Sequence, residues 1–243
     1  MTLLGVLANC SEPAPRSAAT VAVATNFKPT LEHLASDFES RTEYEITIVS
    51  GSTGKLYAQI IQGAPYDIFL AADQTRPKLL VQRGQAAHED HFTYAIGGLA
   101  LWSPRETDIV QDSLTAASLK RLALANPDLA PYGLAAAQLL DRLNLTATLQ
   151  SKFVFGESVG QTFAFISTGN ADMGFVSAAQ ILALPEGARG AYWLIPGQLH
   201  DPIAQDAVLL DGSNAKQAAS AFFTYLRSPR AQETIRNNGY RIK

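Results

Sequence analysis

Three segments of this sequence place small hydroxyl or amide side chains where a strand is expected to end and a helix to begin. They are Thr25-Asn26, Ser50 to Gly54 and Gly156 to Gly160, each of which follows a run with β-like character. Helix N-termini expose unpaired backbone N–H groups and carry partial positive charge, so such junctions suit anions. Ser, Thr and Asn also occur there simply as helix caps. Three junctions of this kind together favour an anion site built from neutral donors.

The third junction has a second interpretation. Gly156-Glu-Ser-Val-Gly160 matches the G-x-S-x-G nucleophile elbow, which also lies between a strand and a helix. A serine esterase would use Ser158 together with His200, the one histidine that follows it, and an acid. The candidate acids are Asp172, Asp201 and Asp206. The sequence has no HGGG-type oxyanion segment, and the esterase is therefore kept as the alternative from a different functional class.

Two further patterns resemble functional motifs but lack residues that the chemistry requires. In Gly51-Ser-Thr-Gly-Lys55, Val49 and Leu56 stand where a P-loop needs glycine and a hydroxyl residue. His88-Glu-Asp-His91 has a spacing that can bind metal on a helix, but its mixed polarity predicts an exposed loop. We therefore predict neither nucleotide hydrolysis nor a metal ion held directly by side chains.

Short apolar runs alternate with helical periodicities along the chain, which predicts mainly parallel sheet covered by helices. Expected strands lie at 21–24, 44–48, 66–70, 92–102, 152–155, 173–176, 192–195 and 203–210. Expected helices lie at 29–39, 53–62, 76–83, 114–123, 134–143, 159–167, 177–183, 215–226 and 229–237. The high strand count fits two α/β lobes with a cleft, and in such folds ligands bind at the carboxyl ends of the strands.

The composition excludes several classes of protein. Of 243 residues, 47% are hydrophobic and 17% are charged, which supports a packed core and argues against disorder and a coiled coil. The net charge is −3, without a concentrated basic patch, so a nucleic-acid partner is not expected. A basic amphipathic stripe for a membrane surface is also absent from the sequence.

The first 20 residues read as the remnant of an export signal followed by a linker. An apolar run of about nine residues, too short to span a bilayer, precedes Cys10, the single cysteine. One thiol rules out an internal disulfide. Leu7-Ala-Asn-Cys10 resembles a lipoprotein cleavage box, although Asn9 is unusual there and no basic residue precedes the run. We expect export to the periplasm, with lipidation of Cys10 as an open alternative.

Several segments in a fixed order together resemble the molybdate-binding proteins of ABC importers, from about Val21 to the C-terminus. The segments that carry the resemblance are 22–27, 51–59, 63–73, 94–97, 126–127, 130–133 and 169–176. The resemblance implies the two-lobed type II periplasmic-binding-protein fold, with the ligand between the lobes. It places lobe I at 21–98 plus 207–243 and lobe II at 99–206, behind the leader at 1–20.

The resemblance also implies the ligand-binding positions. Asn26 lies at a donor position in the first loop, with Thr25 beside it, and Ser52 supplies the hydroxyl of the second loop. Tyr132 contributes from lobe II, and Val159 contributes its backbone N–H at a helix start.

At two positions the resemblance changes or limits the assignment. In the third junction, the amide of Val159 replaces the hydroxyl of Ser158 as the important group. Some members of the family have a tyrosine ligand where this chain has Ser177, which is therefore not counted as a ligand.

The proposed donors suit molybdate or tungstate as cargo. A full dianion needs donors only, whereas hydrogen phosphate keeps a proton that needs an acceptor. Glu157 and Asp73 lie near the proposed loops, so phosphate stays an alternative, and sulfate differs from molybdate chiefly in size. We expect a monomer without cofactor that closes on the oxyanion and delivers it to ABC permease subunits in the inner membrane.

Overall fold

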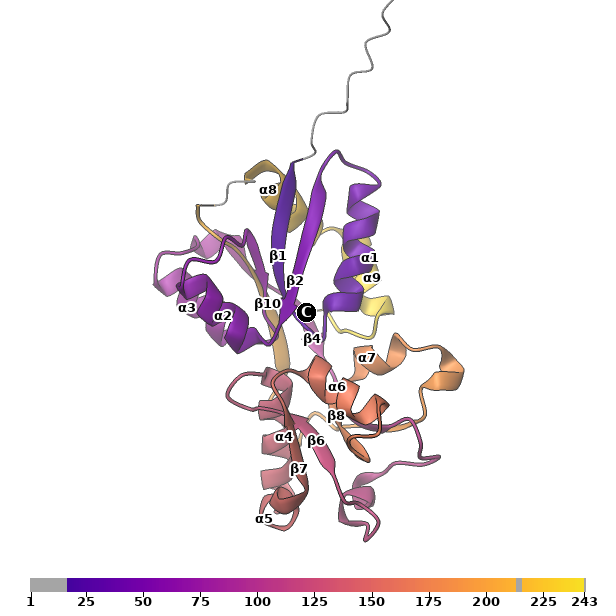
Figure 1. Cartoon of the computed structure of the whole chain (residues 1–243). Helices are drawn as coiled ribbons and strands as arrows, with labels where there is room; N and C mark the ends of the chain where they lie inside the picture. The colour runs from indigo at the N-terminus through magenta and orange to yellow at the C-terminus, as the bar shows by residue number, and fades with distance from the viewer. Residues whose placement is uncertain (1–16, 213–215, 243) are drawn as a thin grey trace, which may run out of the picture.

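The protein folds into two α/β lobes, seen one above the other in Figure 1. The computed structural model describes residues 17–212 and 216–242, and the predicted leader with Cys10 lies outside them. Within these residues each lobe is built on a five-stranded sheet, ordered β2-β1-β3-β10-β4 in lobe I and β7-β6-β8-β5-β9 in lobe II. The predicted two-lobed fold is therefore confirmed.

Lobe I combines the first third of the chain with its C-terminal part. Its strands are β1 (Ala18–Ala24), β2 (Glu45–Gly51), β3 (Ile68–Leu70), β4 (His91–Gly97) and β10 (Ile203–Leu209). Its helices are α1 (Lys28–Glu39), α2 (Thr53–Ile61), α3 (Thr75–Gln82), α8 (Lys216–Tyr225) and α9 (Pro229–Asn237). The strands β1, β2 and β3 are parallel, whereas β10 runs antiparallel to β3 and β4.

Lobe II is formed by the middle of the chain. Its strands are β5 (Leu99–Ser103), β6 (Leu122–Ala125), β7 (Phe153–Gly156), β8 (Met173–Ser177) and β9 (Ala191–Leu194). Its α-helices are α4 (Pro131–Arg142), α5 (Thr146–Leu149), α6 (Val159–Ser167) and α7 (Ala178–Leu182). The pairs of β6 with β7 and β8 are parallel, and those of β5 with β8 and β9 are antiparallel. Both sheets are thus mixed rather than mainly parallel.

Two segments cross between the lobes. The run predicted as one strand at 92–102 breaks at Gly98 into β4 and β5, which belong to different sheets. The return segment ends at Ile203, where β10 begins to pair with β4. The predicted boundary between residues 206 and 207 therefore falls inside β10. The C-terminal segment meets the first crossing, because Arg241 forms a β-bridge with Ile96.

One predicted helix is wrong. Residues 114–123 were expected to be helical, but the chain forms a 3₁₀ turn at Gln111–Thr115 and then strand β6. All four residues of β6 are buried. A short apolar run that is buried on both faces of a sheet has no period-2 signal, so periodicity cannot separate it from a helix. None of the helices in the described ranges is long and apolar enough to cross a membrane.

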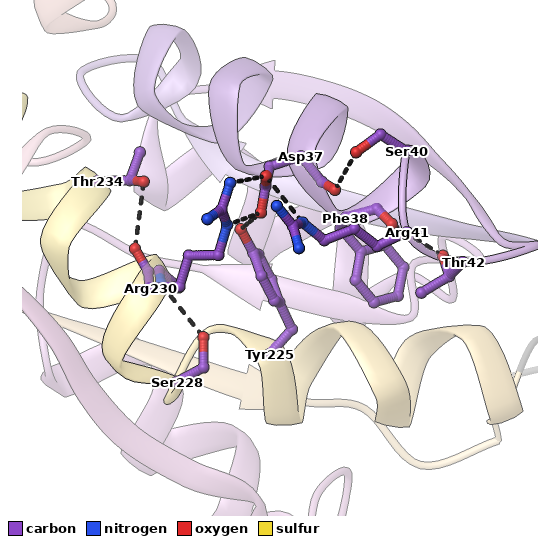
Figure 2. A network of polar contacts seen from close by, with 10 residues as sticks. Asp37, Phe38, Ser40, Arg41, Thr42, Tyr225, Ser228, Arg230 and Thr234 are labelled. Carbon is purple, nitrogen blue, oxygen red and sulfur yellow. Dashed lines mark hydrogen bonds and ion pairs between the residues drawn. The ribbon is translucent and has the colours of Figure 1, made fainter.

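An ionic network fastens the outer helices of lobe I together. Figure 2 shows Asp37 of α1 accepting hydrogen bonds from Arg230 of α9, from Tyr225 of α8 and from Arg41. The Arg230 guanidinium, followed by the bonds from Tyr225 and Arg41, holds the pKa of the Asp37 carboxyl well below its usual range. Burial, followed by the bond to Asp37, raises the pKa of Tyr225 to about 12. These contacts connect the C-terminal helices α8 and α9 to α1.

Candidate functional site

A small cavity lies between the lobes, where three helices begin. Its empty space is about 180 Å³, part of it open to solvent. All five predicted binding residues line it, namely Thr25, Asn26, Ser52, Tyr132 and Val159. Every described residue in its wall is uncharged. The structure therefore brings the predicted residues together, and their role in binding stays a prediction.

The helices α2, α4 and α6 all present their N-termini to this cavity. Ser52 and Ser158 are the N-caps of α2 and α6, and Pro131 occupies the first position of α4. Each of these residues lines the cavity. The unpaired N–H groups and the positive ends of three helix dipoles therefore meet at one point, which favours an anion.

The hydroxyl groups of lobe I keep their protons available. Ser52 Oγ accepts a hydrogen bond from the backbone N–H of Lys55 at 3.4 Å, as an N-cap does. Thr25 Oγ1 accepts from the backbone N–H of Gly160, across the cleft, at 3.1 Å. A hydroxyl that accepts can still donate its own proton. Both side chains can therefore donate to an oxyanion in the cavity.

Backbone N–H groups add further donors. Val159 is the first residue of α6, and its N–H has no acceptor within the described part of the chain. The same holds for the N–H of Asn26, which lies in the turn after β1. Unpaired N–H groups in a buried site are costly, so a ligand that accepts from them is favoured.

The side chain of Asn26 behaves differently from expectation. Its amide nitrogen donates to Gln205 Oε1 at 2.9 Å and to the Tyr240 hydroxyl at 3.1 Å. The Oδ1 atom is buried without a hydrogen-bond partner among the described residues. The amide donor that the sequence resemblance points to is thus engaged inside lobe I, and the backbone N–H is the donor that Asn26 has free.

Tyr132 supplies a hydroxyl from lobe II. This residue lies in the first turn of α4 and is 1% exposed. Its oxygen accepts from Ser177 Oγ at 3.1 Å and from Gln205 Nε2 at 3.3 Å. Burial raises the pKa of Tyr132 well above its ordinary value, so the hydroxyl stays protonated. Two accepted bonds leave that proton for another partner.

Sequence reasoning missed the residues that lie behind the cavity. Gln205, Tyr94 and Tyr240 are all buried and hydrogen-bonded to one another or to Asn26. Ser177, which was not counted, donates to Tyr132. A usable signal existed at Gln205, which is a polar residue inside the apolar run at 203–210. A buried polar side chain within a strand requires partners, and here the partners are site residues.

Four contacts join the two lobes around the cavity, and the residues that make them are called the rims of the lobes. Besides the bond from Gly160 to Thr25, the N–H of Gly54 donates to the Leu129 carbonyl at 2.9 Å. Arg76 donates to the carbonyl of Asp128 at 2.8 Å. Lys55 pairs with Glu157. The structure is therefore a closed form, in which the rims touch.

The geometry does not assemble the esterase alternative. Ser158 Oγ accepts from the N–H of Gln161 at 3.2 Å, which is a capping contact. His200 lines a different cavity, at the crossing segments, and its Nδ1 bonds the Asp201 carbonyl at 2.7 Å. In the described ranges no hydrogen bond joins Ser158 to a histidine, and none joins His200 to a carboxylate, so the predicted triad is not assembled.

The second histidine of the His88-Glu-Asp-His91 segment contacts a carboxylate. His91 Nε2 lies 2.6 Å from Asp206 Oδ2, a contact within lobe I. The described residues contain no group of three or more His, Cys, Asp or Glu side chains that could hold a metal ion.

Comparisons with known proteins identify a family of solute-binding proteins. Residues 19–241 match the model of a family described as bacterial extracellular solute-binding protein. The molybdate-binding protein ModA of Azotobacter vinelandii is 42% identical over 92% of this chain and 89% of the relative. ModA of Rhodobacter capsulatus is 39% identical over 98% and 94%, respectively. The solved structure of the Azotobacter vinelandii periplasmic molybdate-binding protein has a TM-score of 0.89 at 39% identity, covering 93% of this chain and 99% of that one.

Proposed function

Because the chain belongs to the family of bacterial extracellular solute-binding proteins, we propose that it is the substrate-binding component of an ABC importer for molybdate or tungstate. One observation carries this proposal. Three helix N-termini and several free donors meet at a cavity whose described wall has no charged side chain. Such a wall stabilises a small dianion through N–H and O–H groups, without a counter-charge.

The wall also disfavours hydrogen phosphate. The two carboxylates that kept phosphate open as an alternative are engaged elsewhere, because Glu157 pairs with Lys55 and Asp73 pairs with Arg76. Neither lines the cavity. A protonated oxyanion therefore finds no carboxylate to receive its proton. Sulfate is also a dianion, so its exclusion depends on the size of the cavity.

Binding is coupled to closure of the lobes. The donors come from both sides of the cleft, with Ser52 and Asn26 in lobe I and Tyr132 and Val159 in lobe II. An oxyanion contacts all of them only when the lobes meet. The ligand therefore binds the closed form better than an open form and shifts the population toward it.

The surroundings of the protein follow from the same assignment. The chain is exported to the periplasm, works as a monomer without cofactor and delivers its oxyanion to ABC permease subunits in the inner membrane. Lipidation of Cys10 would anchor it to the membrane. Mass spectrometry of the protein from a membrane fraction tests the anchor, because an unmodified N-terminus would remove that part of the proposal.

A melting panel tests the cargo. Purified protein is heated with molybdate, tungstate, sulfate, phosphate or no oxyanion. A ligand present at a thousand times its dissociation constant stabilises the folded state by about 4 kcal/mol. We expect a rise in melting temperature with molybdate and tungstate only. Unchanged melting with both anions would refute the proposed cargo, and an equal rise with sulfate would refute the selectivity.

A further inference from the structure

A fully buried side chain joins the two lobes behind the cavity. Gln205 lies on β10 of lobe I, beside a register shift between β10 and β4, and is 0% exposed. Its Oε1 accepts from Asn26 Nδ2 at 2.9 Å and, at 3.1 Å, from the Tyr94 hydroxyl, whose proton is shared with the Ala71 carbonyl. Its Nε2 donates to the hydroxyl of Tyr132 in lobe II at 3.3 Å. One amide thus contacts predicted binding residues from both lobes.

The direction of the bonds from Tyr240 through Asn26 to Gln205 is set by a backbone carbonyl. The Tyr240 hydroxyl donates to the carbonyl oxygen of Asn26 at 2.8 Å, because a carbonyl can only accept. The Tyr240 oxygen is then left to accept from Asn26 Nδ2. The same nitrogen donates to Gln205 Oε1, so the Gln205 amide must turn its nitrogen toward Tyr132.

The last member of the chain, the Tyr132 hydroxyl, therefore accepts from Gln205 and keeps its own proton to donate. The Tyr132 oxygen has two lone pairs, and Gln205 and Ser177 donate to it. Its proton is left for the cavity that Tyr132 lines. The hydroxyl is closely packed, because a Cβ added at Gly97 would lie 2.0 Å from it. It cannot move toward Gly97 without displacing the crossing segment.

We propose that Gln205 is a positioning residue that makes the Tyr132 hydroxyl a donor to the bound oxyanion. This inference rests on the proposed function and adds to it. Tyr132 and Gln205 belong to different lobes, so their bond joins lobe II to lobe I in this closed form. In the closed form the donor is therefore oriented toward the cavity that encloses the anion. This orientation favours fully ionised oxyanions, because the Tyr132 hydroxyl offers the ligand a proton and does not accept one from it.

A double-mutant cycle tests the proposal by molybdate titration calorimetry. The variants are Gln205→Met, Tyr132→Phe and the pair. Loss of a hydrogen bond to a charged ligand should weaken binding by about 10- to 100-fold in Tyr132→Phe. Gln205→Met, which keeps length but cannot donate, should weaken it at least about fivefold. If Gln205 acts through the hydroxyl, the double variant should match Tyr132→Phe within about twofold.

A charge-carrying variant provides a readout that a purely structural role would not move. In Gln205→Glu the introduced carboxylate would accept the Tyr132 proton and turn the oxygen lone pairs toward the cavity. The side chain at this position bonds Asn26, Tyr94 and Tyr132, and the buried carboxylate next to it in the chain, Asp206, is engaged by His91, Thr93 and Gln74. Affinity should therefore fall further than in Gln205→Met at pH 8. It should recover partly at pH 6, where the carboxyl gains a proton to donate, whereas the affinity of the parent stays flat.

The outcomes separate the two levels of proposal. If the parent does not bind molybdate, the proposed function fails and this inference fails with it. If the parent binds but Gln205→Met has parental affinity, Gln205 does not position the donor. The proposal is also refuted if Gln205→Met weakens molybdate binding equally in the parent and in the Tyr132→Phe variant. Gln205 would then affect binding without acting through the Tyr132 hydroxyl.

Two variants keep the experiment decisive if Gln205→Met folds poorly. Ser177→Ala removes the other donor to Tyr132 and should weaken binding only when the Tyr132 hydroxyl is present. Persistence of that loss in the Tyr132→Phe background would count against the orientation of the hydroxyl. Gln85→Met makes the same chemical change in a different cavity of lobe I, and it should retain parental affinity.

Discussion

The two lobes build their halves of the cavity in different ways. Lobe I fixes Asn26 from behind, through Tyr240 of the C-terminal segment and Gln205 of β10. Lobe II presents Tyr132 and Val159 directly at the starts of α4 and α6. The Tyr132 hydroxyl takes one of its two bonds from lobe I. The Asn26 side chain is therefore held by lobe I alone, whereas the Tyr132 hydroxyl has partners in both lobes.

This contrast predicts which changes will affect binding most. A change that separates Tyr132 from lobe I should have the largest effect. A change to a donor within lobe I should come next, followed by a change to the exposed rim. A change to the outer helices of lobe I should alter stability and leave binding unaffected.

The largest effect is expected for Gly97→Ala. The new methyl group would lie 2.0 Å from the Tyr132 hydroxyl and 2.7 Å from Gln205 Nε2, so the hydroxyl must leave its place. We expect molybdate affinity to fall about 100-fold or more, because a charged hydrogen bond and lobe contact are lost together. Gly187→Ala is the matched control, since nothing lies within 4 Å of its added Cβ. Parental affinity in Gly97→Ala would contradict the close packing.

A smaller effect is expected at the capping serines. Ser52→Ala and Ser158→Ala each remove an N-cap, which costs about 1 kcal/mol of stability. Only Ser52→Ala should also weaken molybdate binding, by about 10-fold or more, because its hydroxyl is a predicted ligand. Calorimetry with melting curves separates the two effects. Equal affinity losses in both variants would remove the distinction, and loss of ester hydrolysis in Ser158→Ala would revive the esterase.

A modest effect is expected at the rim. The side chains of Lys55 and Glu157 are 48% and 63% exposed, and exposed pairs contribute about 0.2–1 kcal/mol. Lys55→Met should therefore weaken binding by less than about fivefold, and the difference from the parent should shrink at 1 M salt. A large loss that resists salt would mean that Lys55 acts on the ligand itself.

The smallest effect on binding is expected for Asp37→Asn. The folded-state pKa of Asp37 lies below its unfolded value of 3.8, so its stabilisation is complete above pH 3.8 and is lost as the pH falls further. At pH 7 we expect a loss of about 1 kcal/mol of stability with unchanged affinity. Denaturation measured at pH 7 and pH 3 checks the sign, because the difference should be smaller at pH 3.

The sequence indicated most of lobe I and five residues that line the cavity between the lobes, whose role in binding stays a prediction. Amphipathic helices such as α1 and α6 have clear periodicity, and the junctions before α2 and α6 carry capping residues. It failed at β6, whose buried four-residue run has no alternation. It also could not split the apolar run at 92–102 between two sheets, because apolarity does not record which sheet a strand joins.

The hydrogen bonds that Asn26 makes behind the cavity could not be predicted from the sequence for a different reason. Tyr240 lies 214 residues from Asn26 in the sequence, and Gln205 lies 179 residues from it. No local pattern links residues so far apart, and each alone reads as an isolated polar or aromatic position. These partners also decide where the Asn26 amide nitrogen points. The sequence therefore could not show that this nitrogen is engaged inside lobe I.

The uncharged wall of the cavity has a consequence for how the loaded protein can be detected. A dianion held by neutral groups keeps its full charge, and the one titratable side chain in the described wall, Tyr132, stays protonated. The loaded protein should therefore carry two more negative charges than the empty one, without exchange of protons. On a native gel it should migrate faster toward the anode. Cargo loading thus becomes visible as an electrical property of the whole molecule.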